Sequence, residues 1–257
     1  MLERAIGAGE NGGPCASVTR DRGALNFDPN LADKWVKGLP SEVEFWDIWI
    51  KTGGALWPEG FKFRTDPNAI LQTYMAGFLP DSPSVSILDV GSGPLTCLGK
   101  QCVSKTIKIT AIDPLADTYN SLLDRYGINP PVRTIQGFAE QLTSKFSPET
   151  FDLVFSRNAI DHSYRPDLAI EEMIKVVKKN RYVVLGHVPN EGLKEGYEGL
   201  HQWDFTRSEY GDFIIKSPYQ EVNITKKFLS IARIRCEIRQ ETSLSETEFL
   251  LAEILKL

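Results

Sequence analysis

The sequence predicts an α/β fold whose centre is a mostly parallel, doubly wound sheet. From residue 85 onward, short apolar runs of strand length alternate with stretches of helical pattern. Nearly continuous apolar strands that alternate with helices are typical of a parallel sheet covered on both faces. Two glycines follow the first apolar run and an acid ends the second, so these two strands carry the most informative turn of the chain.

Length, charge and cysteine content limit the kinds of protein this chain can be. Its 257 residues suit one α/β domain with a modest extension, or at most two small domains. With a formal net charge of -5 and no basic block, the chain is a poor candidate for binding nucleic acid or an anionic membrane, and we expect neither as a partner. The cysteines Cys15, Cys97, Cys102 and Cys236 form no CxxC pair and no metal-type spacing with histidine, so we expect reduced thiols and no metal site.

The N-terminal segment predicts neither a leader peptide nor a stable element. Residues 1–30 are rich in Gly, Asn, Asp and Pro without periodicity, which is typical of a disordered tail. They hold no apolar core of a signal peptide, and no apolar run approaches the ~20 residues that span a bilayer. We therefore expect a soluble, cytoplasmic protein.

A helical preface, residues 31–83, precedes the sheet. Ser41 and Glu44 match a capping box, which predicts a helix that starts near Ser41. Asp66 and Pro67 predict the start of another helix. That helix would place five apolar side chains on one side: Ile70, Leu71, Tyr74, Met75 and Phe78. Three tryptophans of the preface (Trp46, Trp49 and Trp57) either cover the substrate or form a contact in a homodimer, and composition does not choose between these.

The sheet domain is predicted over residues 84–257. Its first five strands are expected at 85–90, 107–112, 132–136, 151–156 and 181–188. Helices are expected near 96–103, 115–126, 138–144 and 166–178. Residues 189–225 break this alternation and look like an inserted loop and hairpin. Two further strands, at about 231–240 and 247–255, are long enough to pair with each other, which gives seven strands.

The turn at Gly91 and Gly93 predicts a site for a nucleoside-bearing cofactor. Glycine lets the backbone turn tightly and a ligand approach closely, because a Cβ would block both. Asp113 lies about 20 residues beyond the glycines, where an acid can accept hydrogen bonds from a ribose diol. Its alternative role is to cap the helix that begins at Pro114. Dinucleotides and S-adenosylmethionine are both bound at this edge of such sheets.

The details of the turn favour S-adenosylmethionine over a dinucleotide. The dinucleotide fingerprint needs a third glycine or other small residue where Thr96 stands, so that a pyrophosphate can rest on the helix N-terminus. Asp89 precedes the first glycine by two positions. A carboxylate there can hold the cationic amino group of a methionine moiety and would repel a pyrophosphate.

Several segments together resemble class I S-adenosylmethionine-dependent methyltransferases of the type 11 kind. "LDVGSGPLT" resembles the first motif, "AIDPLAD" the ribose-binding strand end, and "QGFAEQL" the adenine-side segment. "FDLVFSRNAIDHS" resembles the fourth strand with its loop, and "MIKVVKKNRYVVLGHV" the helix and strand that follow. The resemblance covers about residues 84–188. It implies a Rossmann-like sheet of seven mostly parallel strands with a C-terminal antiparallel strand, and S-adenosylmethionine as the cofactor.

The resemblance also implies which residues bind the cofactor, with some departures from the family pattern. Phe138 stands where the family often has an acid for the adenine amino group, so packing on adenine and plain core burial are both open for it. Arg64 either reaches the cofactor carboxylate or forms a surface salt bridge. Asn180 replaces a glycine of the usual turn and tolerates a positive φ. The residues expected at the cofactor are Asp89, Gly91, Ser92, Gly93, Asp113, Pro114, Phe138, Ala139, Asn158 and Arg64.

The three histidines map to the sheet edge where an acceptor must sit. His162 follows the fourth strand, His187 ends the fifth, and His201 lies in the insertion. Histidine titrates near neutral pH and can take a proton from a hydroxyl, although a lone histidine is more often structural. Asp161 with His162 is the first choice for a general base, and His201 the second. Trp203 either stacks on a sugar or anchors the insertion.

These features predict an enzyme that transfers a methyl group from S-adenosylmethionine to a small-molecule or glycan-type acceptor, at oxygen. The insertion is the expected specificity element, and it loosely resembles methyltransferases of bacterial surface-polysaccharide pathways. Two other classes remain open. One is a nicotinamide-dependent oxidoreductase on a Rossmann sheet, and the other is a non-catalytic S-adenosylmethionine-binding protein.

Overall fold

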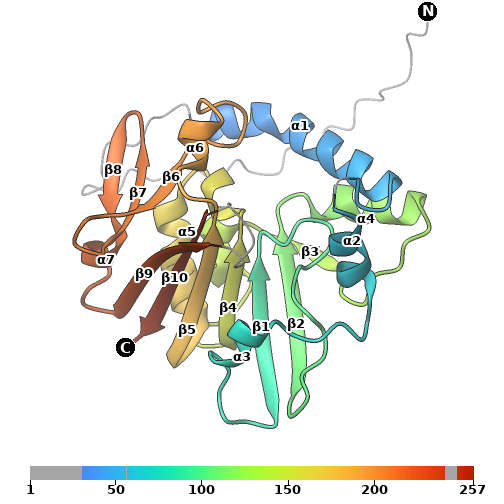
Figure 1. The fold of residues 1–257 in the computed structure, drawn as a ribbon, viewed down its shortest axis with the longest axis horizontal. Coiled ribbons are helices and arrows are strands. Elements are labelled where there is room, and N and C mark those ends of the chain that lie inside the picture. The colour runs from blue at the N-terminus through green and yellow to red at the C-terminus, as the bar shows by residue number, and fades with distance from the viewer. Residues whose placement is uncertain (1–30, 56, 241–247) are drawn as a thin grey trace, which may run out of the picture.

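A computed structural model describes residues 31–55, 57–240 and 248–257 of the chain, so the tail predicted at 1–30 lies outside the described residues. The centre is a seven-stranded sheet in the order β3-β2-β1-β4-β5-β10-β9 (Figure 1). Strands β1 to β5 run parallel to one another, and β10 runs antiparallel to both β5 and β9. This confirms the predicted α/β, Rossmann-like sheet with a C-terminal antiparallel strand.

The strands lie close to their predicted positions. Their bounds are β1 Ser84–Val90, β2 Thr106–Asp113, β3 Thr134–Gln136, β4 Phe151–Arg157, β5 Val177–His187, β9 Ala232–Gln240 and β10 Glu248–Lys256. Strand β5 begins four residues earlier than expected, and a register shift against β4 accommodates the extra length. Asn180 has a φ of 57°, as its place in the usual glycine turn predicted.

Both faces of the sheet are buried, which explains why the strand sequences are nearly continuous apolar runs. On one face α5 (Pro166–Val176) packs Ile170 and Met173 against the sheet. The 3-10 helix η1 (Ala139–Ser144) lies against α5, and α4 (Ala116–Arg125) follows β2. On the other face Leu71, Met75 and Leu98 pack on β1 and β4.

The helix predicted near residues 96–103 is absent, and this expectation was wrong. The segment instead runs as an irregular chain beside residues 69–72. Leu71 N–H donates to Gln101 O at 2.8 Å, and Lys100 N–H donates to Ala69 O at 2.7 Å. Gln72 bonds Cys97 O at 2.6 Å through its side chain. These partners satisfy the backbone groups that a helix would otherwise pair internally.

The helical preface differs from its prediction at both expected helix starts. Helix α1 spans Leu31–Lys51, so the Ser41 capping box does not begin it. Ser41 lies inside the helix next to Pro40, and its hydroxyl donates to Gly38 O at 2.7 Å. The helix expected from Asp66 is reduced to α3 (Thr73–Ala76), because the preceding residues pair with the 97–101 segment. Helix α2 (Pro58–Thr65) lies between them.

Helix α1 lies across the edge of the sheet toward which the parallel strands point, and the insertion meets it there (Figure 1). The contact is close at Gly38, where an added Cβ would lie 2.7 Å from the Leu200 side chain. The insertion comprises α6 (Glu191–Lys194), a three-stranded antiparallel sheet and α7 (Ile224–Lys227). Its strands are β6 Asp204–Arg207, β7 Phe213–Ser217 and β8 Gln220–Asn223. Among the described residues, no helix is long and apolar enough to cross a membrane.

Candidate active site

A cavity of about 620 Å³ lies at the carboxyl ends of the parallel strands, under α1. Its volume is within the usual range of small-molecule sites, ~300–1,000 Å³. All of the residues expected to bind the cofactor line it, and so do two of the predicted catalytic residues. The lining includes Arg64, Asp89, Gly91, Ser92, Gly93, Asp113, Pro114, Phe138, Ala139, Asn158, His162 and His201.

The glycine turn after β1 forms the floor of the cavity, and each glycine is required for a different reason. Gly91 and Gly93 have φ angles of 69° and 62°, which L side chains rarely adopt. A Cβ at Gly91 would collide with the Cβ of Ala159. A Cβ at Gly93 would lie 3.0 Å from the Trp46 ring of α1. At these two positions the turn therefore presents only backbone to the cavity.

Asp113 holds the glycine turn in place and still faces the cavity. Its Oδ2 accepts from Gly93 N–H at 3.1 Å, and its Oδ1 accepts from Leu115 N–H at 2.9 Å. Burial raises the pKa of Asp113 to about 6, although these two N–H groups oppose the shift. The alternative role as the cap of a helix that begins at Pro114 was wrong, because α4 begins at Ala116 and Leu115 is at its N-cap position. Each oxygen of Asp113 has a further lone pair for the predicted ribose role.

Asp89 is a second buried carboxylate that lines the cavity. It is 1% exposed, and its Oδ2 accepts a short hydrogen bond of 2.5 Å from the Thr96 hydroxyl. Burial raises the pKa of Asp89 to about 6, against the opposing effects of Thr96 and Arg64. A buried carboxylate with one protein partner is a fitting counter-ion for a ligand ammonium group.

Arg64 comes to the cavity from α2 and forms no salt bridge with any residue that the structure describes. It donates to Leu95 O at 2.7 Å. Its guanidinium lies 5.8 Å from the centre of the Trp46 ring and 5.6 Å from that of Trp49. The cation is therefore held between the glycine turn and α1, with its charge at the edge of the cavity.

The remaining predicted cofactor residues have identifiable surroundings. Phe138 is partly buried, and its ring centre lies 5.9 Å from that of Trp35 on α1. Both rings line the cavity, so Phe138 is available to a flat ligand. Asn158 has a φ of 45°, and its Oδ1 accepts from Val188 N–H at 3.1 Å, which ties the end of β4 to the end of β5.

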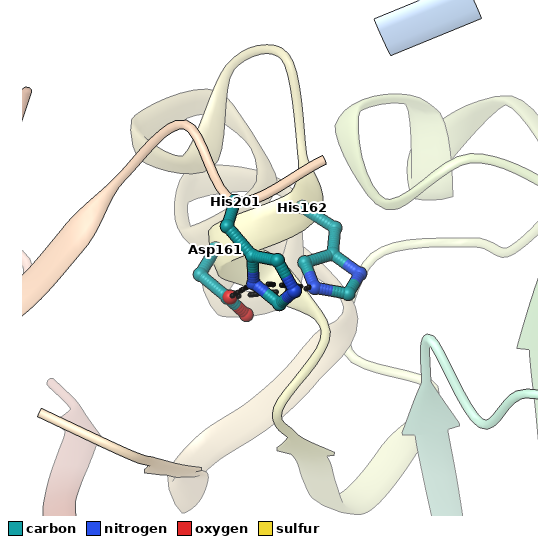
Figure 2. Close-up of side chains that lie close together, drawn as sticks. All are labelled: Asp161, His162 and His201. Atoms are coloured by element: carbon teal, nitrogen blue, oxygen red, sulfur yellow. Dashed lines mark hydrogen bonds and ion pairs between the residues drawn. The ribbon is translucent and has the colours of Figure 1, made fainter. Parts of the chain in front are cut away.

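The three histidines converge on one carboxylate, Asp161. Figure 2 shows His162 and His201 beside it. Asp161 and His162 belong to the short helix η2 (Ile160–His162) after β4, and His201 comes from the loop before β6. His162 Nε2 lies 3.1 Å from His201 Nδ1, and these atoms lie 3.5 and 3.4 Å from Asp161 Oδ2. His187 Nδ1 lies 3.3 Å from the other oxygen, Asp161 Oδ1.

The electrostatics of this cluster favour charge on Asp161 and on His201. Burial alone would raise the pKa of Asp161, but the adjacent imidazoles hold it well below its usual range. The hydrogen bond to Asp161 raises the pKa of His201. Burial and the charge of Asp161 together raise the pKa of Glu191, which lines the cavity beside the cluster, to about 7.

Trp203 anchors the insertion and does not reach an acceptor. Its side chain is fully buried, and its Nε1–H donates to Ser163 O at 2.9 Å. The sugar-stacking alternative for this residue is therefore wrong, because no part of the ring faces the cavity. The bond instead joins the loop that carries His201 to the loop that carries His162.

Several lining residues were not identified from the sequence. Trp35, Glu42 and Phe45 reach the cavity from α1, and Arg157 from the end of β4. The abundance of tryptophan in the preface was a sequence signal for α1, but it left covering and dimer contact equally open. In the described chain the tryptophan face of α1 covers the cavity. A homodimer stays a prediction.

Residues 88–185 match the family model described as a methyltransferase domain. A comparison with curated protein sequences gives no significant match. Among solved structures, phosphoethanolamine N-methyltransferase 2 of Haemonchus contortus is 16% identical with a TM-score of 0.49, over 71% of this chain and 51% of that one. The N-methyltransferase NodS of Bradyrhizobium japonicum is 15% identical with a TM-score of 0.42, over 67% and 78%. The [4+2]-cyclase SpnF is 21% identical with a TM-score of 0.35, over 46% and 44%.

Identities this low concern the fold alone, and the chain spans less than two thirds of the length of the cyclase and of the Haemonchus enzyme. The family model covers less than half of the chain, so the methyltransferase domain is a similarity of residues 88–185, and S-adenosylmethionine is the cofactor that this similarity supports. The cavity fits this cofactor. Its floor is open backbone at Gly91 and Gly93, and Asp113 and Asp89 offer carboxylates for a ribose diol and an ammonium group.

Proposed function

We propose that the protein transfers a methyl group from S-adenosylmethionine to a hydroxyl oxygen of a small-molecule or glycan-type acceptor. The observation that supports this most is the position of the Asp161–His162–His201 cluster. It borders the same cavity as the cofactor residues, but its members come from η2 and from the insertion. The acceptor would therefore lie between the glycine turn and the histidines.

The protein contributes chiefly by positioning the two reactants. The cofactor supplies a methyl group that its sulfonium already activates toward displacement. Asp113 and the glycine turn would fix the nucleoside, and Asp89 with Arg64 would fix the methionine end. Holding reactants in line contributes about 7–11 kcal/mol in favourable intramolecular reactions. The roof formed by α1 and Leu200 would exclude water from the reacting atoms.

A hydroxyl acceptor must lose its proton during transfer, and the histidine cluster is the candidate to receive it. His162 and His201 line the cavity, whereas Asp161 lies behind them and is 1% exposed. A carboxylate in this place orients the imidazoles and stabilises a protonated one. Asp161 would thus act as a positioning residue, and one of the two histidines as the base.

The experiment is a methyl-transfer assay with labelled S-adenosylmethionine and a panel of polyols, sugars and phenols, with mass spectrometry to place the methyl group. With an accepted substrate, His162→Asn should lower kcat by about 10²–10⁴-fold, as expected for loss of general base catalysis. The affinity for S-adenosylmethionine should not change. The matched control is Glu209→Gln, an exposed acid of the insertion, which should retain full activity.

Three outcomes would overturn the proposal. Calorimetry that detects NAD binding and no response to S-adenosylmethionine would indicate an oxidoreductase. Tight S-adenosylmethionine binding without turnover on any acceptor class would indicate a binding protein. Methylation of amines alone, unaffected by His162→Asn, would contradict the hydroxyl acceptor.

A further inference from the structure

We infer that Asp161, His162 and His201 form a binding site for a single divalent transition-metal ion, with Zn²⁺ the best match. Each of the three residues offers one ligand atom, and these atoms all lie within 4.8 Å of one another. Two imidazoles and one carboxylate with an open position are a donor set typical of catalytic zinc sites. Figure 2 shows the three side chains directed toward one point.

The distances within the cluster fit a metal centre. The triangle formed by His162 Nε2, His201 Nδ1 and Asp161 Oδ2 has sides of 3.1, 3.4 and 3.5 Å. Its centre is therefore about 1.9 Å from each atom, slightly less than the ~2.0–2.2 Å of zinc–nitrogen and zinc–oxygen bonds. An ion just above the plane would satisfy all three bond lengths with little movement of the protein.

Hydrogen bonds cannot satisfy the same three atoms. If His162 donates its Nε2–H to His201 Nδ1, that nitrogen is an acceptor and has no proton for Asp161 Oδ2. If His201 Nδ1–H donates instead, it can bond either His162 Nε2 or Asp161 Oδ2, and the other atom is left without a partner. Protonating both nitrogens would place two N–H groups against each other at 3.1 Å. A cation at the centre accepts a lone pair from every one of them.

Buried polar atoms next to the triangle also indicate a missing partner. Asp161 Oδ1 and both ring nitrogens of His187 are buried and have no hydrogen bond, although His187 Nδ1 lies 3.3 Å from Asp161 Oδ1. Unsatisfied groups of this kind are rare in folded proteins. With a metal on Oδ2, His187 would take the place of the outer residue that orients a ligating carboxylate.

The open coordination position would face the cavity, because both histidines line it and Asp161 closes the opposite side. Glu195 lines the same cavity and adds negative charge that favours a cation. This further step rests on the proposed function: an acceptor hydroxyl bound at the open position would lose its proton more readily. The two histidines would then act as ligands, the metal would acidify the acceptor hydroxyl, and the proton released would pass to a carboxylate of Glu191 or Glu195, which line the same cavity.

The test is metal binding by the chelator-treated full-length protein, measured by calorimetry and by metal content after dialysis. We expect one Zn²⁺ per chain that survives dialysis. Co²⁺ should give the visible spectrum of a tetrahedral site without a thiolate charge-transfer band, which excludes binding by cysteine. Asp161→Asn and His201→Ala should each weaken Zn²⁺ binding by at least 100-fold. Glu198→Gln, an exposed acid of the His201 loop, is the matched control and should not weaken it.

S-adenosylmethionine binding by the variants verifies that they fold. Absence of stoichiometric Zn²⁺ or Co²⁺ binding by the wild type would overturn the inference, and so would binding that survives both substitutions. The two proposals fail separately. Methyl transfer that is insensitive to chelators, by protein without metal, would refute the part of the metal in the reaction and keep the histidine base. Tight metal binding without transfer to any hydroxyl would refute the proposed function alone.

Discussion

At the scale of single residues, two carboxylates of the cavity are buried, and burial opposes their charged forms. Asp89 and Asp113 end neighbouring strands, and both have a pKa raised to about 6 from an ordinary value of 3.8. A raised pKa means that the folded state binds the proton more tightly than the unfolded chain does. The protein without cofactor therefore loses stability as the pH rises from about 4 through 6. The proposed role of these residues in binding the cofactor would explain why such a cost is tolerated.

The substitution Asp89→Asn should reverse this cost. The amide keeps the shape of the side chain and can still accept from Thr96, but it carries no charge to desolvate. Two pKa units correspond to about 3 kcal/mol, so the variant should be more stable than wild type by up to ~3 kcal/mol at pH 8. At pH 4 the two proteins should be nearly equal.

Urea unfolding of both proteins at the two pH values measures the difference. In the same experiment S-adenosylmethionine should stabilise wild type at pH 8 and stabilise Asp89→Asn less, because the ammonium group loses its counter-ion. An equal gap in stability at pH 4 and pH 8 would contradict the assignment of the raised pKa to Asp89.

At the scale of elements, α1 completes the cofactor site by lying over the glycine turn. The Trp46 ring approaches Gly93, its Nε1–H donates to Glu42 at 2.7 Å, and Trp49 packs edge-on against it at 5.2 Å. The glycine at position 93 is thus required by its positive φ and also by the space that α1 occupies.

Two glycine substitutions separate these requirements. Gly93→Ala and Gly127→Ala both place a Cβ at a φ near 65°, and both should lose about 1–2 kcal/mol of stability. Only Gly93→Ala meets a neighbour, at 3.0 Å, whereas nothing lies within 4 Å of the Cβ position at Gly127. Calorimetry should show S-adenosylmethionine binding weakened by tenfold or more in Gly93→Ala and unchanged in Gly127→Ala. Equal losses of affinity would show that α1 does not form part of the site.

Elements that depend on contacts within a short stretch of the chain could be predicted from the sequence, whereas those that depend on contacts between distant parts could not. The sequence predicted the strands, the glycine turn and the position of Asp113, because each is encoded in a short stretch of consecutive residues. The helix expected near 96–103 failed because residues 69–72, from the preface, took its backbone partners. The role of α1 could not be derived for the same reason. Nothing in a helical pattern states which surface the helix will cover.

At the scale of the whole molecule, the insertion and the sheet domain meet at the cluster of histidines. The sequence placed His162, His187 and His201 at one edge but could not show that they share Asp161, since 39 residues separate His162 from His201. The contact between the insertion and the sheet domain depends on two residues. Trp203 donates a hydrogen bond to the loop after β4, and Leu200 packs against Gly38 of α1. Three separate parts of the chain therefore position one side chain, His201.

Trp203→Phe should loosen this junction. The substitution keeps an aromatic ring but leaves Ser163 O buried without its donor, at a cost of about 1–3 kcal/mol, and it also leaves a small void. For a chain of this size the melting temperature should fall by ~2–4 °C for each kcal/mol, which thermal unfolding followed by circular dichroism can measure. The control is Tyr210→Phe, at a side chain of the insertion that is 85% exposed, and it should not change the melting temperature.

Because the bond that Trp203→Phe removes joins the loops of His162 and His201, Zn²⁺ binding should weaken more than S-adenosylmethionine binding. An unchanged melting temperature, or equal losses for both ligands, would show that Trp203 does not hold the two loops together.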